Sequence, residues 1–323
     1  MIRGLEPAEA FFLGTSPDHP QRMETSPTRA SSSPPRTPPA LVVTGMHRSG
    51  TSLTAAILTS AGVDMGDRLL GADAANPRGH FEDVDLLLFH QRALAANGVS
   101  ADGFVTAGAP EVPALMLAEA HDIVAARRAK ERLWGWKEPR TVLFLDFWKR
   151  LLPEARFVFV FRRPWEVLDS LFRRGNAEFI AEPRLALGVW RHYNERLLQF
   201  ARRAVDRCLV VEASQVVEDQ AGFAAAVRTR LDLPVGFPSP QCEPRLFHSD
   251  HASWRPWLVR QLDPGAYELY LELRGLAGSN SPLPPLAVEA GGMERALEAA
   301  LAEWSRAGHA EGRLEAASRA AAT

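Results

Sequence analysis

A chain of 323 residues with 46% hydrophobic and 24% charged residues has the composition of an ordinary globular protein, long enough for one sizeable core or two small ones. Its net charge of −2 offers no basic surface for nucleic acid or for an anionic membrane. Two cysteines are too few for a disulfide framework or a cysteine-rich metal site, which favours a reducing compartment. The first residues do not show the basic region and apolar core typical of a signal peptide, and no apolar run approaches the roughly 20 residues that span a bilayer, so we expect a cytoplasmic protein. The excess of arginine over lysine suggests a bacterial source.

The first 39 residues differ in composition from the rest of the chain. They are rich in proline and serine and have no sustained hydrophobic period, which predicts a disordered tail to which we assign no function. The remainder is predicted to be one α/β domain, with a core over residues 40–240 and a loop and helical extension over residues 241–323.

Apolar runs alternate with helical periods along this core. We expect strands at 41–43, 62–65, 133–136, 157–161 and 208–211. We expect helices at 51–61, 82–96, 111–132, 142–152, 164–174, 185–205, 264–276 and 291–306. Strands that alternate with helices predict a parallel sheet covered on both faces, which is a three-layer αβα fold.

A glycine-bracketed turn joins the first strand to the first helix. Gly45 and Gly50 enclose it, and Gly62 follows the helix where a helix end favours glycine. A strand, a tight turn and a helix start point backbone N–H groups at an anion, with the positive end of the helix dipole behind them. We interpret residues 41–61 as a phosphate-binding segment, although a strand–turn–helix without a ligand uses glycine in the same way.

This loop departs from the Walker A pattern G-x-x-x-x-G-K-[ST] at one position. Gly45, Gly50 and Ser52 fit the pattern, but Thr51 stands in the place of the lysine and the nearest cation is Arg48. Transfer of a γ-phosphoryl group needs that lysine and Mg²⁺, because several negative charges crowd together. A loop with one arginine and hydroxyl groups suits one 5′-phosphate and a less charged transferred group, such as sulfuryl.

A second strand–turn–helix follows at residues 156–174. Arg162 ends its strand, Pro164 opens its helix, and Ser170 lies two turns into that helix. With the phosphate loop, this stretch resembles the sulfotransferases that use 3′-phosphoadenosine 5′-phosphosulfate. Two further segments agree with the bacterial branch of that family, NPRGHFE at 76–82 and GWKEPR at 135–140. The four segments occur in order over about residues 41–211.

The resemblance implies a donor and the residues that bind it. In the family the first loop holds the 5′-phosphosulfate, which here implies Gly45, His47, Arg48, Ser49, Gly50, Thr51 and Ser52. An arginine after a central strand and a serine eight positions later hold the 3′-phosphate, which implies Arg162 and Ser170. The expected fold has a central parallel sheet and a P-loop-like phosphosulfate-binding loop. The product nucleotide would be 3′-phosphoadenosine 5′-phosphate, and no metal is implied.

The expected reaction is an in-line displacement at sulfur by a hydroxyl or amine of a small-molecule or carbohydrate acceptor. Positioning and electrostatics do most of the work in such transfers. Arg48 is the candidate for the charge of the leaving 5′-phosphate. Lys137 resembles the family lysine that contacts the transferred group, and a solvated lysine that lies along Trp136 is the alternative.

Glu82 is the preferred general base. Its segment resembles the region where carbohydrate-type members of the family have a glutamate base, and the histidine that cytosolic members use is missing after Lys137. We expect partial burial beside Phe81 to raise the pKa of Glu82 from about 4.3 towards neutrality. The alternative role for Glu82 is a cap or dipole partner at a helix start, beside Asp83. The alternative base is His80.

Two departures from the family leave parts of the donor site open. The fourth strand ends at residues 211–213 with Val-Glu-Ala instead of Tyr-Glu-Asp, so adenine needs another partner, Trp165 or Tyr193, each more often a core aromatic. The family's C-terminal loop for the 3′-phosphate has no clear counterpart. Three residues of the C-terminal extension are candidates to replace it: Arg245, His248 and Arg255.

A P-loop nucleotide kinase and a non-catalytic nucleotide-binding module are the alternative functions. Thr51 in the lysine position argues against a kinase, as does Arg162 where a kinase strand would end in a Mg²⁺-binding aspartate. A non-catalytic module would need neither Lys137 nor Glu82. The acceptor and the oligomeric state stay open, and we expect neither a nucleic acid nor a membrane as a partner.

Overall fold

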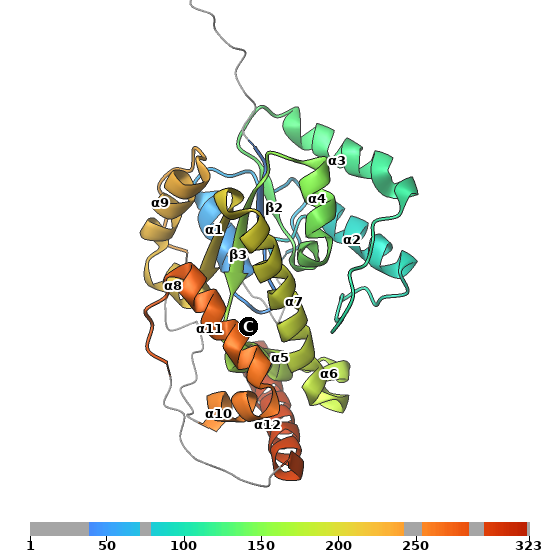
Figure 1. The fold of residues 1–323 in the computed structure, drawn as a ribbon, viewed down its shortest axis with the longest axis vertical. Coiled ribbons are helices and arrows are strands. Elements are labelled where there is room, and N and C mark those ends of the chain that lie inside the picture. Colours follow the sequence, from blue (N-terminus) through green and yellow to red (C-terminus); the bar gives the residue numbers. More distant parts are fainter. Residues whose placement is uncertain (1–38, 72–78, 242–253, 284–293, 322–323) are drawn as a thin grey trace, which may run out of the picture. The chain divides into compact units, whose positions relative to one another are not determined.

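The computed structural model describes residues 39–71, 79–241, 254–283 and 294–321, and a four-stranded sheet forms its middle layer (Figure 1). The strands are β1 (Leu41–Thr44), β2 (Gly135–Lys137), β3 (Arg156–Phe161) and β4 (Cys208–Glu212). They pair in the order β2-β1-β3-β4, and every pair is parallel. Because parallel strands end at the same edge, the loops that follow all four strands meet there.

The side chains of β3 explain why the sheet needs a layer on each face. Phe157, Phe159 and Phe161 lie in the larger of two hydrophobic clusters, and Val158 and Val160 lie in the smaller one. Successive residues of a strand point to opposite faces, so a strand that is apolar at every position must be covered on both. The three-layer αβα prediction is therefore confirmed.

The helices divide between these clusters (Figure 1). The smaller cluster includes side chains from α1 (Thr51–Ser60), α8 (Ala213–Glu218) and α9 (Gln220–Leu231). The larger includes side chains from α2 (Val84–Ala96), α3 (Leu117–Arg128), α4 (Leu145–Leu151), α5 (Pro164–Arg174), α6 (Ala177–Ala181), α7 (Pro183–Arg203), α10 (Trp254–Leu262), α11 (Pro264–Ala277) and α12 (Glu294–Ala321). The described residues also contain three 3₁₀ helices: η1 (Ala114–Met116) before α3, η2 (Pro139–Phe144) between β2 and α4, and η3 (Val205–Arg207) between α7 and β4.

Helix α12 packs along α5, the helix that follows β3. Trp304 of α12 meets the ring of Phe172 edge to face at 5.3 Å, and its Nε1 donates to Asp169 Oδ1 at 3.0 Å. Arg173 of α5 pairs with both Glu311 and Glu315 of α12, at 3.0 and 2.8 Å. The last described helix is thus part of the same core as the sheet.

Most predicted elements are present, with shifted ends. The expected strand at 62–65 is absent from the described residues, which show one isolated parallel bridge from Asp64 to Trp134. The helices expected at 111–132 and 142–152 begin as η1 and η2. Four helices were not predicted: α6, α8, α9 and α10. Helix α12 continues to Ala321, beyond the expected end at 306.

Several predictions fall on residues that the structure does not describe. They are residues 1–38 of the disordered tail predicted over 1–39, residues 76–78 of the NPRGHFE segment, and the basic candidates Arg245 and His248. The predicted boundary at residues 240 and 241 also stays a prediction.

Candidate active site

The turn between β1 and α1 is tight, and its geometry requires glycine at two positions. A side-chain carbon on Gly45 would lie 2.0 Å from the carbonyl oxygen of Val160 in β3, so only glycine fits between the two strands. Gly50, the residue before α1, has a φ of 91°, and Arg48 has a φ of 68°. Both lie in the left-handed region that non-glycine residues seldom adopt, which turns the chain sharply into the helix.

Polar groups of this loop are buried without a protein partner. Within the described residues, Ser49 Oγ and His47 Nε2 are buried and have no hydrogen-bond partner. The first turn of α1 contains no acidic residue that would neutralise the positive end of its dipole. An unsatisfied buried polar atom costs about 1–3 kcal/mol, so these two atoms fit a loop that closes around an anionic ligand.

His47 is an uncharged imidazole at neutral pH. Its burial, together with the nearby positive charge of Arg140, holds its pKa well below the usual value. The ring packs edge-on against Phe104 at 5.5 Å and lies 6.2 Å from Tyr193. His47 therefore offers a hydrogen-bonding atom rather than a cation to whatever the loop binds.

The structure joins the two predicted phosphate sites. Arg48 Nε donates to Ser170 Oγ at 2.8 Å, across 122 positions of the sequence. Arg162 lies at the end of β3, where its Nε donates to Glu166 Oε2 at 2.8 Å, and its side chain is 10% exposed. The 5′- and 3′-phosphate candidates are therefore neighbours at the carboxyl edge of the sheet.

Lys137 and the start of α1 share one acceptor. Ser52 Oγ and Lys137 Nζ each donate to the carbonyl oxygen of His80 at 3.0 Å, and Lys137 Nζ also donates to Glu82 Oε1 at 2.9 Å. Lys137 is 2% exposed. The alternative of a solvated lysine is therefore wrong, and its ammonium group lies beside the phosphate loop.

Glu82 is not the cap of the helix that follows it. Asp83 is the N-cap of α2, and its Oδ1 accepts from the backbone N–H groups of Asp85 and Leu86 at 2.9 and 3.4 Å. The residue before Glu82, Phe81, has a φ of 54°, a backbone conformation that costs about 1–3 kcal/mol for a bulky side chain. The backbone is therefore locally strained at Phe81, immediately before the residue whose carboxylate pairs with Lys137.

The expected rise in the pKa of Glu82 is wrong. Burial alone would raise this pKa, but the ion pair with Lys137 outweighs it and lowers the pKa below the usual value. Glu82 is 6% exposed and is therefore as buried as expected, but its surroundings include the ammonium group of Lys137, which the sequence did not place there. This lowered pKa keeps the Glu82 carboxylate ionised at neutral pH.

Three residues of the site were missed as functional candidates. Arg140 NH1 lies 3.8 Å from Glu82 Oε2 and donates to Glu138 Oε1 at 2.6 Å. The other oxygen of Glu138 lies 2.6 Å from His90 Nδ1. Glu138 and Arg140 were visible as part of the GWKEPR segment, but nothing in the local pattern pointed to His90.

The candidates for adenine stacking are core aromatics. Trp165 is 1% exposed and packs against Tyr267 and Tyr270, with ring centres 6.3 and 5.3 Å away. Tyr193 is completely buried, and its hydroxyl donates to the carbonyl oxygen of Gly103 at 2.9 Å. A ring with no exposed face cannot stack on a ligand, so this prediction is wrong for both.

Of the three basic candidates, the structure describes only Arg255, which forms an ion pair with an aspartate. Its NH1 lies 2.9 Å from Asp169 Oδ1, and its guanidinium lies over the Trp304 ring at 4.9 Å. The carboxylate partner of Arg255 reduces the attraction of Arg255 for a 3′-phosphate, and its role there stays a prediction.

The Val-Glu-Ala segment at the end of β4 has contacts of its own. Glu212 accepts hydrogen bonds from Tyr270 Oη at 3.0 Å and from Ser279 Oγ.

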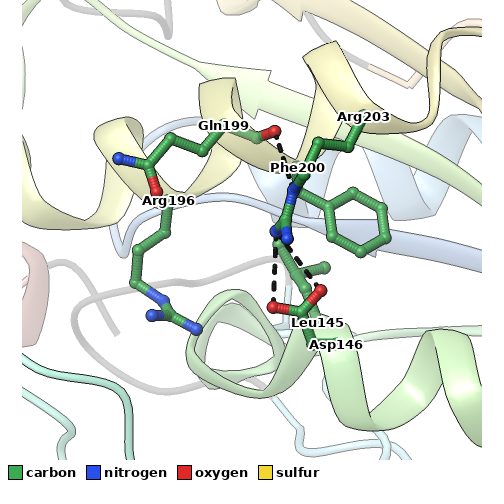
Figure 2. A pocket seen from close by; sticks show the side chains of 6 residues that line it. All are labelled: Leu145, Asp146, Arg196, Gln199, Phe200 and Arg203. Carbon is green, nitrogen blue, oxygen red and sulfur yellow. Dashed lines mark hydrogen bonds and ion pairs between the residues drawn. The ribbon is translucent and has the colours of Figure 1, made fainter.

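A small cavity of about 50 Å³ has Phe200 in its lining (Figure 2), and the Phe200 ring packs against Phe157 of β3 with ring centres 4.9 Å apart. Figure 2 shows Arg203 directed at Asp146 across it, with nitrogen–oxygen distances of 3.3 Å. Its lining consists of Leu145, Asp146, Arg196, Gln199, Phe200 and Arg203. None of the predicted site residues is among them, so we do not assign the active site to this cavity.

The described residues offer neither a metal centre nor a membrane-spanning helix. They contain no group of three or more histidine, cysteine, aspartate or glutamate side chains arranged to hold a metal ion. Among the helices that the structure describes, none has both the length and the apolar character needed to cross a bilayer.

A family model described as "Sulfotransferase family" matches residues 39–237, and no curated protein matches the chain. Similar solved structures include the sulfotransferase domain of an olefin synthase from Synechococcus, with 17% identity, a TM-score of 0.42, and coverage of 84% of this chain and 96% of that one. The sulfotransferase domain from the curacin biosynthetic pathway has 12% identity, a TM-score of 0.37, and coverage of 66% and 79%. Sulfotransferase STF9 from Mycobacterium avium has 16% identity, a TM-score of 0.43, and coverage of 83% and 76%.

Proposed function

Because the chain belongs to the sulfotransferase family, we propose that it transfers the sulfuryl group of 3′-phosphoadenosine 5′-phosphosulfate to a hydroxyl or amine of a small-molecule or carbohydrate acceptor. The observation that best supports this proposal is the position of Lys137. Its buried ammonium group shares the His80 carbonyl with Ser52 at the start of α1, and it pairs with Glu82 at 2.9 Å. An ammonium group and a carboxylate thus lie side by side next to a phosphate-type loop.

The binding residues divide between the two ends of the donor. The loop from Gly45 to Ser52 would hold the 5′-phosphate with its backbone N–H groups, with the unsatisfied Ser49 Oγ and with Arg48. Arg162 and Ser170 would hold the 3′-phosphate. The donor itself supplies an activated sulfuryl group on a 5′-phosphate, which leaves as a stable anion.

The catalytic residues would act on the acceptor and on the transferred group. Glu82 would take the proton from the acceptor hydroxyl as the new oxygen–sulfur bond forms and the bond from sulfur to the 5′-phosphate oxygen breaks. Lys137 would face the sulfuryl oxygens, and Arg48 the negative charge that develops on the 5′-phosphate. His80 is retained as the alternative base. On the basis of composition and family resemblance, the proposal also includes that the enzyme is bacterial and cytoplasmic and needs no metal.

The proposal is tested by calorimetric titration of the protein with nucleotides. We expect 3′-phosphoadenosine 5′-phosphate to bind in the presence of a chelator and more tightly than ATP, because the loop lacks the Walker lysine. Tighter binding of ATP, or loss of binding in chelator, would overturn the proposal. A screen of alcohols, sugars and amines with ³⁵S-labelled donor would then identify the acceptor.

A further inference from the structure

Behind the Glu82–Lys137 pair lies a row of fully buried polar side chains. Trp148 Nε1 donates to His90 Nε2 at 2.8 Å, and His90 Nδ1 lies 2.6 Å from Glu138 Oε2. Arg140 NH1 donates to Glu138 Oε1 at 2.6 Å. His90 and Glu138 are completely buried, and Arg140 is 5% exposed. Burying charged groups costs several kcal/mol unless they are paired, so a row of this kind needs a reason.

The hydrogen bonds determine which way each member of this row points. Because the indole N–H of Trp148 can only donate, His90 Nε2 must accept, and the proton of the neutral ring is then on Nδ1. That proton is donated to Glu138, whose other oxygen binds Arg140. Glu138 is therefore held from both sides, and Arg140 cannot rotate without leaving a buried carboxylate unpaired.

Arg140 in turn lies between Glu82 and the backbone of Ala101. Its NH1 lies 3.8 Å from Glu82 Oε2, and its Nε donates to the carbonyl oxygen of Ala101 at 2.6 Å. Glu82 thus has two cationic neighbours, a direct partner in Lys137 and a more distant one in Arg140. The Glu138 carboxylate also acts on Glu82 and raises its pKa, whereas His47 lowers that pKa only when it is protonated.

The two cations differ in how freely they can move. Lys137 has a flexible stem and a point charge that three donors can share among different acceptors. Arg140 is fixed by Glu138 and by Ala101. When Lys137 engages the transferred group, Glu82 would have to share its direct partner with that group. A buried carboxylate with a weakened partner has a higher pKa, so Glu82 would take up a proton before the acceptor could supply one.

We propose that Arg140 is a positioning residue, held in place by Glu138 and His90, that gives Glu82 a second and permanently charged partner while Lys137 engages the transferred sulfuryl group. This inference rests on the proposed function for the roles of Lys137 and Glu82. Arg140 acts through Glu82, and its effect is therefore measured on Glu82.

The test is an NMR titration of the full chain labelled with ¹³C at the glutamate carboxyl carbons, with the Glu82 signal assigned by its loss in Glu82→Gln. Lys137→Met imitates a lysine that is engaged elsewhere. In this variant we expect Glu82 to stay ionised at pH 7 because Arg140 remains. Adding Arg140→Gln should then raise the pKa of Glu82 by at least about one unit, the effect expected for loss of an opposite charge within 4–6 Å.

The matched control is Arg196→Gln on the same Lys137→Met background. Arg196 also bonds to the 139–144 segment, through the carbonyl oxygens of Val142 and Leu143, but the structure gives it no contact with Glu82. It should leave the pKa of Glu82 unchanged. An equal pKa with and without Arg140, or an equal rise in the control, would overturn the proposal.

If circular dichroism shows that the double variant does not fold, the Lys137→Met variant alone decides the question. Protonation of Glu82 at pH 7 in that variant would show that Arg140 does not suffice as a partner and would overturn the proposal. The titration needs no nucleotide. A wild-type protein that fails to bind 3′-phosphoadenosine 5′-phosphate would therefore refute the proposed function without affecting this measurement.

Discussion

Arg48 and Ser170 are joined by a hydrogen bond of 2.8 Å from Nε to Oγ. Arg48 belongs to the loop before α1, and Ser170 lies in α5. Because a hydroxyl can accept one hydrogen bond and still donate its own proton, Ser170 can hold Arg48 and a 3′-phosphate together. The two ends of a bound donor would then be linked through the protein as well as through the adenosine.

The first prediction is that Arg48→Lys and Ser170→Ala are not additive in their effect on binding of 3′-phosphoadenosine 5′-phosphate. Ser170→Ala removes the acceptor of the shared hydrogen bond and Arg48→Lys replaces its Nε donor by a methylene group, so the double variant should lose less affinity than the sum of the single losses, by at least about 0.5 kcal/mol. Calorimetry on the four proteins gives this difference. Thr59→Ala is the control, because its hydroxyl bonds within α1 to the carbonyl oxygen of Ala55. It should be additive with Arg48→Lys, and additivity in both pairs would contradict the prediction.

The second prediction concerns selectivity for the 3′-phosphate. Arg162→Ala should weaken binding of 3′-phosphoadenosine 5′-phosphate about tenfold to a hundredfold, the value of a charge-assisted hydrogen bond of roughly 1.5–3 kcal/mol. Adenosine 5′-phosphosulfate, which has no 3′-phosphate, should bind almost as well as it does to the wild type. Equal losses for the two nucleotides would mean that Arg162 supports the fold, for example through Glu166, rather than the ligand.

The third prediction assigns the base. Glu82→Gln keeps the size of the side chain and can still accept from Lys137, but it cannot take a proton. Turnover with an identified acceptor should fall about 10²–10⁴-fold, chiefly in kcat, while nucleotide affinity is retained. His80→Asn is measured in parallel. A nearly normal Glu82→Gln enzyme beside an inactive His80→Asn enzyme would transfer the role to His80.

The fourth prediction is a pH dependence of stability. The folded protein lowers the pKa of Glu82, so its contribution is complete above the pKa of the unfolded chain and is lost as the pH falls through the lower pKa of the folded state. Glu82→Gln should therefore cost about 3 kcal/mol of unfolding free energy at pH 7, the value for breaking a buried ion pair, and progressively less below about pH 4. Urea unfolding at each pH measures the difference between the two proteins.

A surface ion pair provides the control for this prediction. Glu272 pairs with Arg202 at 2.8 Å, and both side chains are more than half exposed. Glu272→Gln should cost less than about 1 kcal/mol at any pH. A Glu82→Gln difference as small as this one, or one that stays constant down to pH 3, would argue against a strong buried pair.

Elements with a local pattern could be predicted from the sequence, whereas side-chain partners could not. The strand β3 is apolar at five successive positions, and Gly45 and Gly50 define the phosphate loop. Helix α9 also has a pattern, with Phe223, Val227 and Leu231 spaced by four, but its many alanines weaken the contrast between its faces and it was missed.

The ion pair between Glu82 and Lys137 joins residues 55 positions apart, and the contact between His90 and Glu138 spans 48. Such contacts depend on how strands and helices are arranged, and no local pattern records them. This is why the environment of Glu82 was predicted as dry but not as cationic, and why the sign of its pKa shift was wrong. The order of the segments along the chain nevertheless brought Arg48, Lys137 and Arg162 to one sheet edge, as the prediction of parallel strands requires.

The packing of α12 against α5 has a consequence for the order in which the protein is made. Residues 39–237 match the family, but the 28-residue helix α12 lies beyond them and supplies Trp304 to the side chains of Asp169 and Phe172. A ribosome synthesises the phosphate loop and α5 well before α12. The helix that presents Ser170 therefore lacks this support until α12 has emerged, and a chain that stops before α12 would expose the apolar face of α5 to chaperones and proteases.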